Sequence, residues 1–249
     1  MTSDDLANQL LPGVPEKEIR TILERAGGNE IGSGKFASPE SSAALAVNGF
    51  GWFLNRPADR PAFPPLADLD WPAKRVDVER QMRFPWNAGR HPWLDGAVET
   101  KTHLIGVETK RFEPYRDVKT AKLSDAYDRD IWGEDMKRWC AMRDSLRTQP
   151  TGFRFLDAAQ LVKHAFGLVT EGRRICKDAV LLYLYAEPTV GRAITQETFT
   201  RHREEIERFS EVVSGDEVRF AACSWREWLA CFAGPAKEHA ECVLERFAP

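Results

Sequence analysis

One uninterrupted apolar segment constrains the fold of this chain more than any other feature. Residues 179–186, AVLLYLYA, are apolar at eight consecutive positions and are bounded by Asp178 and by Glu187-Pro188. The segment favours a strand, and it is far shorter than the roughly 18 apolar residues that span a bilayer. A strand that is apolar on both faces is typical of the buried centre of a sheet. We therefore expect an α/β domain built around this strand.

The remaining patterns predict the elements around this strand. Three extended segments with polar turns precede it and favour an antiparallel meander. The expected elements, in chain order, are a helix at 15–26, a helix starting at Ser38, strands at 76–84, 93–100 and 103–112, helices at 132–146 and 157–167, the strand at 179–186, a helix at 196–213, a strand at 216–222 and a helix capped by Ser224. This order predicts a mixed β-sheet, a three-strand meander plus later strands, flanked by helices.

Composition excludes several classes of protein. The net charge is −3, whereas a chain that coats nucleic acid through its overall charge is usually basic. Five cysteines without a C-x-x-C pair argue against structural zinc and favour reduced thiols in the cytoplasm. The first residues carry acids where a secretory signal carries Lys or Arg, so we expect neither secretion nor a membrane.

The segment 91–114, HPWLDGAVETKTHLIGVETKRFEP, holds the residues that could carry chemistry. Asp95 lies in one expected strand, and Glu108 and Lys110 lie in the next. Side chains alternate across a strand, so Glu108 and Lys110 share a face, and the antiparallel connection brings Asp95 beside Glu108. Two carboxylates suit Mg²⁺, with Mn²⁺ as an alternative, and a lysine can neutralise an attacked phosphate. This set predicts metal-assisted phosphodiester hydrolysis.

With Leu94-Asp95 and Glu108-Thr109-Lys110 in consecutive expected strands, the chain resembles the PD-(D/E)xK nuclease superfamily, which has the restriction-endonuclease-like fold. Leu94 stands where the family motif has proline. The layout matches from Ser38 to Phe232, and the whole chain resembles stand-alone bacterial restriction-endonuclease-like proteins. We accordingly divide it into an N-terminal helical extension, 1–37, and a nuclease-like domain, 38–249.

The resemblance implies a role for each residue of the motif. Asp95 and Glu108 would bind the metal, the backbone carbonyl of Thr109 could complete its ligands, and Lys110 would be the catalytic lysine. The alternative is that Glu108 and Lys110 form a solvated strand face while Asp95 belongs to a turn.

Related nucleases often carry supporting polar residues on two helices. Glu40, at the start of the helix before the meander, could reach the metal, or it could only complement the helix dipole. Gln160 and Lys163 share a face of the later helix and are candidates of the same kind. His164 beside them is interpreted as a structural residue.

Nucleic-acid contacts are expected after the second motif strand. The candidates are basic residues of one short stretch, which could instead be a solvated loop: Arg111, Arg116, Lys119 and Lys122. Arg80, Arg83 and Arg90 are further candidates. Trp86 and Trp93 could stack on bases, although a place in the core is the simpler interpretation.

Together these features predict a metal-dependent nuclease, with a DNA endonuclease of defence, restriction or repair favoured. One alternative is a nuclease-fold module that binds nucleic acid or protein without cleavage. Another is an effector that a protein partner activates. A homodimer is a further possibility that the sequence leaves open.

Overall fold

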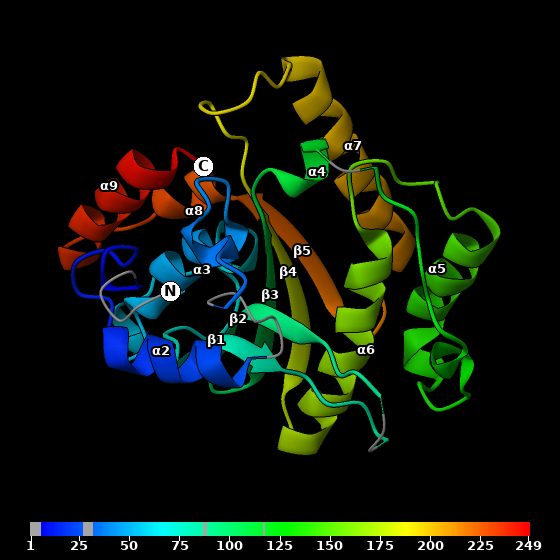
Figure 1. The fold of residues 1–249 in the computed structure, drawn as a ribbon. Coiled ribbons are helices and arrows are strands. Elements are labelled where there is room, and N and C mark those ends of the chain that lie inside the picture. Colours follow the sequence, from blue (N-terminus) through cyan, green and yellow to red (C-terminus); the bar gives the residue numbers. More distant parts are fainter. Residues whose placement is uncertain (1–5, 27–31, 87–88, 117) are drawn as a thin grey trace.

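A five-stranded mixed sheet forms the centre of the molecule (Figure 1). The computed structural model describes residues 6–26, 32–86, 89–116 and 118–249, and the structural statements below concern these residues. The strand order is β1-β2-β3-β4-β5. The first three strands form an antiparallel meander, whereas β4 and β5 run parallel to β3. The strands are β1 (Arg75–Gln81), β2 (Trp93–Glu99), β3 (His103–Lys110), β4 (Asp178–Tyr185) and β5 (Arg219–Ser224).

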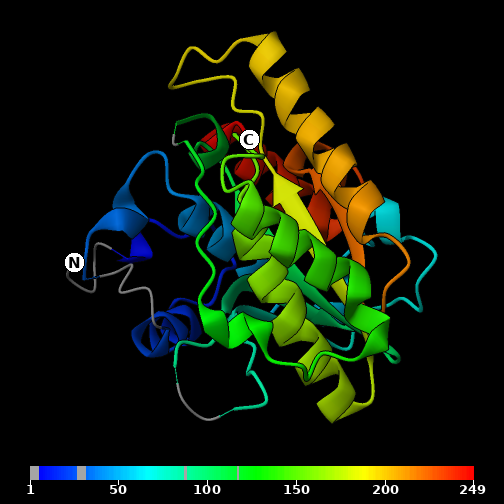
Figure 2. The same cartoon turned by 90° about the vertical axis from the view of Figure 1, so that its right-hand side faces the viewer.

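Helices cover both faces of this sheet (Figures 1 and 2). One group contains α2 (Glu16–Arg25), α3 (Ser42–Gly51), α8 (Trp225–Leu229) and α9 (Pro235–Phe247). The other contains α5 (Lys137–Thr148), α6 (Ala158–Ile175) and α7 (Gln196–Val213), and the short helix α4 (Glu113–Arg116) follows β3 directly. Single 3₁₀ turns lie at Lys35–Ala37, Pro57–Asp59, Pro64–Leu66, Asp125–Asp128 and Glu134–Met136. The mixed, helix-flanked sheet that the sequence predicts is confirmed.

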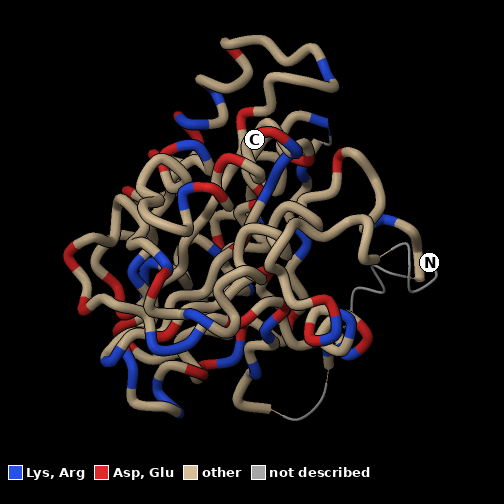
Figure 3. The backbone as a smooth tube through the Cα atoms, turned by 90° about the vertical axis from the view of Figure 1, so that its left-hand side faces the viewer, with Lys and Arg blue, Asp and Glu red and all other residues tan. Residues whose placement is uncertain are grey.

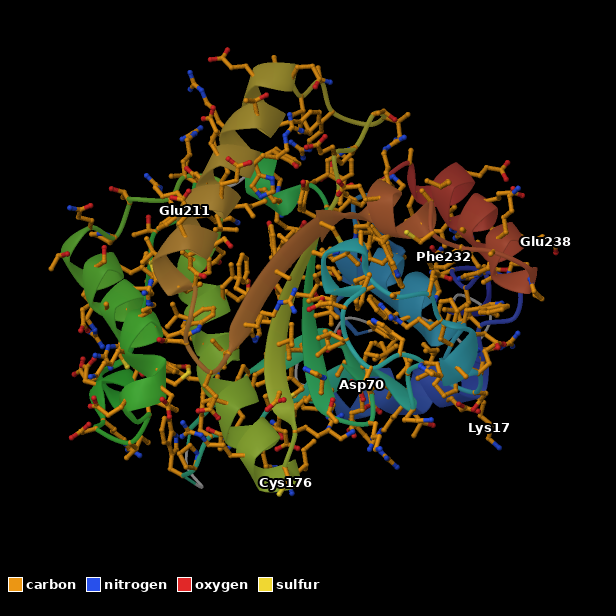
Figure 4. All side chains as sticks on the ribbon, turned by 180° about the vertical axis from the view of Figure 1, so that it is seen from behind. Lys17, Asp70, Cys176, Glu211, Phe232 and Glu238 are labelled. Atoms are coloured by element: carbon orange, nitrogen blue, oxygen red, sulfur yellow. The ribbon has the colours of Figure 1, made fainter. Side chains whose placement is uncertain are left out.

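The expected buried strand is β4, which lies between β3 and β5 and separates two hydrophobic clusters. Its side chains alternate between them: Val180 and Leu182 pack with α3, α8 and α9, whereas Leu181 and Tyr183 pack with α5, α6 and α7. Figure 4 shows Phe232 after α8, on the α3 side of the sheet, where its ring lies 5.6 Å from that of Phe53. An eight-residue apolar segment is therefore explained by helices on both faces.

The helix α6 continues eight residues beyond the end that Gly167 predicts. Gly167 lies inside the helix, where a Cβ atom would come within 2.8 Å of Met82 Cβ and 2.9 Å of Pro92 Cγ. The missing side chain therefore lets α6 approach the β1–β2 hairpin. The role of Gly167 is thus close packing and not, as the sequence predicts, the end of the helix.

The helix before the meander also starts later than predicted. Ser38 and Pro39 precede α3, which begins at Ser42 with Ser41 as its N-cap, and the Ser41 hydroxyl accepts a 3.0 Å bond from the Ala44 amide. Ser38 instead closes a turn, because its carbonyl accepts a bond from the Ser41 amide. Glu40 consequently lies in this turn and not in the first turn of the helix.

The N-terminal segment packs into the same core as the rest of the chain. Leu11, Ile19, Leu23 and Phe36 are buried in the hydrophobic cluster that contains α3, α8 and α9. The division at residue 37 stays a prediction, but the two parts share one core on this side of the sheet. Among the described helices, none combines the length and the low polarity that crossing a membrane requires.

Candidate active site

The three motif residues line one cleft of about 990 Å³. Asp95 comes from β2, and Glu108 and Lys110 come from β3. The cleft also receives residues from the turn before α3, from β1, from the end of the β1–β2 hairpin and from α4 and α6. These further lining residues are Lys35, Ser38, Glu40, Ser41, Ser42, Ala43, Glu79, Gln81, Gly89, Arg90, His91, Trp93, Glu113, Arg116 and Gln160.

Asp95 lies where the pairing between β2 and β3 ends. The antiparallel register joins Gly96–Glu99 to residues 104–107 and stops before Asp95 and Glu108. The Asp95 carboxylate replaces the missing strand contact, because its Oδ2 accepts the Thr109 amide at 2.6 Å and the Thr109 hydroxyl at 3.0 Å. A strand end that opens in this way turns the Asp95 side chain toward β3.

Glu108 is almost completely buried and has a cation-forming group at each carboxylate oxygen. Oε1 forms an ion pair with Lys110, and Oε2 lies 2.9 Å from His164 Nε2. The His164 ring is only 2 % exposed, and its nitrogens have no well-aligned hydrogen bond among the described residues. The helix α6 therefore places a histidine against the carboxylate that the sequence predicts as a metal ligand.

The electrostatics of the three residues follow from this geometry. Burial and the nearby Glu108 carboxylate raise the pKa of Asp95 to about 7, although Lys110 and Thr109 act against this rise. Burial alone would raise the pKa of Glu108, but Lys110 and His164 outweigh it and hold that pKa at about 2. Burial opposes the charge of Lys110, yet Glu108 and Asp95 raise its pKa above the usual range. Lys110 is therefore a persistent cation.

Glu40 reaches the cleft from the turn before α3 and binds two arginines there. Its Oε1 accepts a 2.6 Å bond from Arg192 Nε, and its Oε2 lies 3.1 Å from Arg192 Nη2 and 3.3 Å from Arg116 Nη1. The hydrogen bond from Arg192 is the largest influence that lowers the pKa of Glu40. Arg192 belongs to the segment between β4 and α7, so this ion pair joins two parts of the chain that are distant in sequence.

The candidates on α6 divide into residues inside and outside the cleft. Gln160 lines it, as expected, and His164 lies one turn further along the helix. Lys163 is half-buried and is not among the lining residues. The structural interpretation of His164 missed its contact with Glu108. The spacing of four residues from Gln160 is the signal that could have revealed it.

The predicted nucleic-acid contacts also divide. Arg116 lines the cleft, whereas Lys119 and Lys122 do not, and Lys122 borders a separate shallow hollow. Arg111 is buried instead of exposed, because its guanidinium donates to the backbone carbonyls of Pro39 and Phe247. It ties the end of β3 to the turn before α3 and to the end of α9, so the structure corrects its predicted place on the surface.

Two further basic residues reach the cleft: Lys35, which the sequence analysis did not name, and Arg90, which it named as a candidate for nucleic-acid contact. Arg80 and Arg83, the other two candidates of that kind, are not among the lining residues, and Arg80 forms ion pairs with Asp77 and Glu99 instead. Lys35 lies in the 3₁₀ turn before α3, and Arg90 lies at the end of the β1–β2 hairpin. No local pattern marks Lys35, because only the fold brings its turn to the strand ends. On the face shown in Figure 3, positive and negative residues are interspersed. The positive charge near the motif is therefore local.

The side chains of the cleft can supply some of the ligands that a hard divalent cation needs. Asp95 and Glu108 are oxygen donors. Burial, and after it repulsion from Glu108, raises the pKa of Asp95, and a bound cation would oppose both effects. Among the described residues, no group of three or more His, Cys, Asp or Glu side chains is arranged to hold a metal. Mg²⁺ commonly takes one or two carboxylates and completes its octahedron with water and substrate oxygens, so two carboxylates suffice.

Comparisons with known proteins give one match. A family model described as Restriction Endonuclease associating with ARP matches residues 3–241, nearly the whole chain. No curated protein and no solved structure matches the chain. The expected restriction-endonuclease-like family is confirmed.

Proposed function

This chain belongs to the family described as Restriction Endonuclease associating with ARP, and we propose that it is a metal-dependent nuclease that hydrolyses phosphodiester bonds, with DNA as the favoured substrate. The observation that carries the proposal is the convergence of Asp95, Glu108 and Lys110 on one cleft from the ends of two adjacent strands. The family description supports a nuclease-related role, and the cleft supplies the residue types that this reaction needs.

Asp95 and Glu108 would hold Mg²⁺ or Mn²⁺, and the carbonyl of Thr109 stays the predicted third ligand. When bound, the metal supplies a water of lowered pKa and stabilises charge on the attacked phosphate. Both hydrogen bonds of Asp95 among the described residues use Oδ2, which leaves Oδ1 for the metal in this proposal. Thr109 fixes the orientation of this carboxylate through two bonds.

Lys110 acts as a cation in this proposal and not as a base. Its ion pair with Glu108 keeps it protonated, so it can bind and stabilise negative charge at the scissile phosphate. His164 contacts the Glu108 oxygen that does not face Lys110, and in this proposal it is a positioning residue. Gln160 can hydrogen-bond a phosphate oxygen or a water at the cleft wall, and Arg116 and Arg90 can bind neighbouring phosphates.

The test is metal-dependent cleavage by the purified chain. Plasmid, linear duplex, single-stranded DNA and RNA are incubated with Mg²⁺, Mn²⁺ or EDTA, using wild type, Asp95→Asn, Glu108→Gln and Lys110→Ala. Lys17→Ala, at an exposed position of α2 outside the cleft, is the matched lysine control. We expect cutting that needs metal, is lost in the three site variants and persists in the control. Equal cutting by folded Lys110→Ala protein would overturn the assignment.

The family description favours one alternative, a nuclease that a partner activates. Its words "associating with ARP" support an assembly with a second protein, here taken only as the component abbreviated ARP. A binding module without cleavage would retain nucleic-acid binding in EDTA and give no product in any metal. Five free cysteines support a cytoplasmic location.

A further inference from the structure

Trp93 differs from the other tryptophans of this protein. Each of the other seven has at least one aromatic ring as a neighbour in the structure: Trp52, Trp71, Trp86, Trp132, Trp139, Trp225 and Trp228. Over the described parts of the chain, Trp93 has neither a ring contact nor a hydrogen bond from its indole N–H. It is half-buried and lines the cleft.

Its place on β2 brings this ring next to the motif. Trp93 precedes Asp95 by two residues, which corresponds to about 7 Å along an extended strand. Leu94 between them is fully buried, whereas Trp93 and Asp95 both line the cleft. A phosphate bound near Asp95 and Lys110 would therefore have its neighbouring nucleotide within reach of the indole ring.

The surroundings of Trp93 favour a nucleotide as its partner. Lys35, Arg90 and Arg116 line the same cleft and can each bind a phosphate, although Glu40, Glu79 and Glu113 line it too and Arg116 is paired with Glu40. Gln81 pairs with Trp93 across the sheet. Aromatic side chains between cationic ones are typical of surfaces that bind single strands, because every base has a face on which a ring can stack.

Trp86 provides the contrast within the same hairpin. Its ring stacks on Phe84 at 4.7 Å, and the Arg129 guanidinium lies 4.5 Å from its centre. The Trp86 ring is therefore already stacked, and a base could stack on it only by displacing one of these two neighbours. The structure thus separates two tryptophans that the sequence left equivalent.

We propose that Trp93 stacks on a nucleobase beside the scissile phosphate, so that the preferred substrate has an unstacked base at that position. Such a base occurs in a single strand or at an unpaired nucleotide, whereas neighbours cover both faces of a base inside a regular duplex. The inference rests on the proposed nuclease function and adds its substrate class. It requires no change in the three motif residues.

Binding in EDTA tests the inference apart from cleavage. Anisotropy is measured for fluorescein-labelled single-stranded DNA, single-stranded RNA and duplex DNA with wild type, Trp93→Ala, Trp93→Phe and Trp86→Phe. Stacking on one base predicts that Trp93→Ala weakens single-strand binding about ten-fold or more. Trp93→Phe should retain most of the affinity, and Trp86→Phe should match wild type. The DNA and RNA arms identify the sugar that the cleft accepts.

A scan with abasic nucleotides locates the stacked base, and its wild-type arm does not depend on the folding of a variant. Removing one base at the position next to the cut should weaken binding, and the same removal should have no effect in Trp93→Ala. Cleavage by wild type with Trp93-independent binding would support the nuclease and overturn the stacking. Trp93-dependent binding without any cleavage would uphold the stacking and reject the nuclease function. Wild type that binds no single strand would overturn the inference.

Discussion

Thr109 donates both its amide N–H and its hydroxyl to the same oxygen of Asp95, at 2.6 and 3.0 Å. Thr109 belongs to β3, and Asp95 belongs to β2 just beyond the last paired residues of the two strands. The carboxylate therefore takes a bond that a strand carbonyl would accept in a continued ladder. This arrangement fixes Asp95 in the opening where the two strands separate.

Replacement of Thr109 by valine tests this orientation. The substitution removes the hydroxyl and keeps the amide, so Asp95 should stay near its place but lose one of two restraints. Loss of a hydrogen bond behind a metal ligand typically costs about 10- to 100-fold in metal affinity or activity. Cleavage is measured against Mg²⁺ concentration, and Thr109→Ser serves as the control that restores the hydroxyl. If the Thr109→Val variant needs no more Mg²⁺ than wild type, the hydroxyl does not orient Asp95 for metal binding.

The pH dependence should follow Asp95. Its pKa is raised to about 7 from 3.8 by burial and by Glu108, so protons compete with a metal below neutral pH. We expect Mg²⁺ affinity to rise about ten-fold per pH unit up to pH 7 and to level off above it. The measurement is Mn²⁺ or Mg²⁺ titration of binding between pH 5.5 and 8.5, with Asp95→Asn as the control that should lack this slope.

The same group affects folding without metal. A pKa that is higher in the folded state means that Asp95 stabilises the fold below about pH 4 and loses this contribution as the pH rises through about 7, relative to an unperturbed carboxyl. Asp95→Asn should consequently unfold at higher urea concentration than wild type at pH 8 in EDTA, with a smaller difference at pH 4.5. An asparagine variant that is less stable at both pH values would contradict the assigned repulsion.

His164 should act through Glu108. The ring is buried with its Nε2 2.9 Å from the carboxylate, so His164→Ala removes a neighbour of the predicted metal ligand and leaves Lys110 in place. We expect the Mg²⁺ concentration for half-maximal cleavage to rise about ten-fold or more, and His164→Gln to recover part of the loss. Lys163→Ala, at the preceding position of the same helix but outside the cleft, is the control. An effect on kcat alone would argue against positioning of the metal ligand.

Glu40 offers a test that distinguishes its two interpretations. Both of its carboxylate oxygens bind arginines, Arg192 on one side and Arg116 on the other. If Glu40 serves to hold these cations, Glu40→Gln should release them toward phosphate and tighten DNA binding in EDTA several-fold at low salt, because exposed charges act mainly through such screened attraction. We expect this result, measured by anisotropy from 50 to 200 mM salt. A higher Mg²⁺ requirement with unchanged binding would instead place Glu40 at the metal.

The sequence predicted the elements better than the contacts between distant segments. The alternation in β3 correctly put Glu108 and Lys110 on one face, where they form an ion pair. The apolar run of β4 correctly predicted an interior strand covered on both faces, but the middle strand of the sheet is β3. Local patterns do not contain the ion pair of Arg192 with Glu40, which spans 152 positions. Local patterns also do not predict the burial of Arg111, because its hydrogen-bond acceptors are the backbone carbonyls of Pro39 and Phe247, which are distant in sequence.

Gly167 shows why a local helix signal failed, and it yields the last prediction. In an exposed helix, replacing glycine by alanine stabilises by about 1 kcal/mol. Here the new Cβ would lie 2.8 Å from Met82 Cβ, so Gly167→Ala should push α6 away from the hairpin. Overpacking of this kind typically costs about 1–3 kcal/mol, which outweighs the helix preference.

The free energy of unfolding, measured in urea, shows whether Gly167→Ala stabilises or destabilises the protein. Gly167→Ala should unfold at lower urea concentration than wild type, whereas Glu204→Ala, at an exposed position of α7, should change the free energy by no more than about 0.5 kcal/mol. The displaced hairpin also carries Arg90 and leads into Trp93, so the alanine variant should lose single-strand affinity together with stability. A more stable Gly167→Ala protein would mean that the helix preference of alanine outweighs the overpacking. Gly167 would then not be the residue that sets how closely α6 packs against the hairpin.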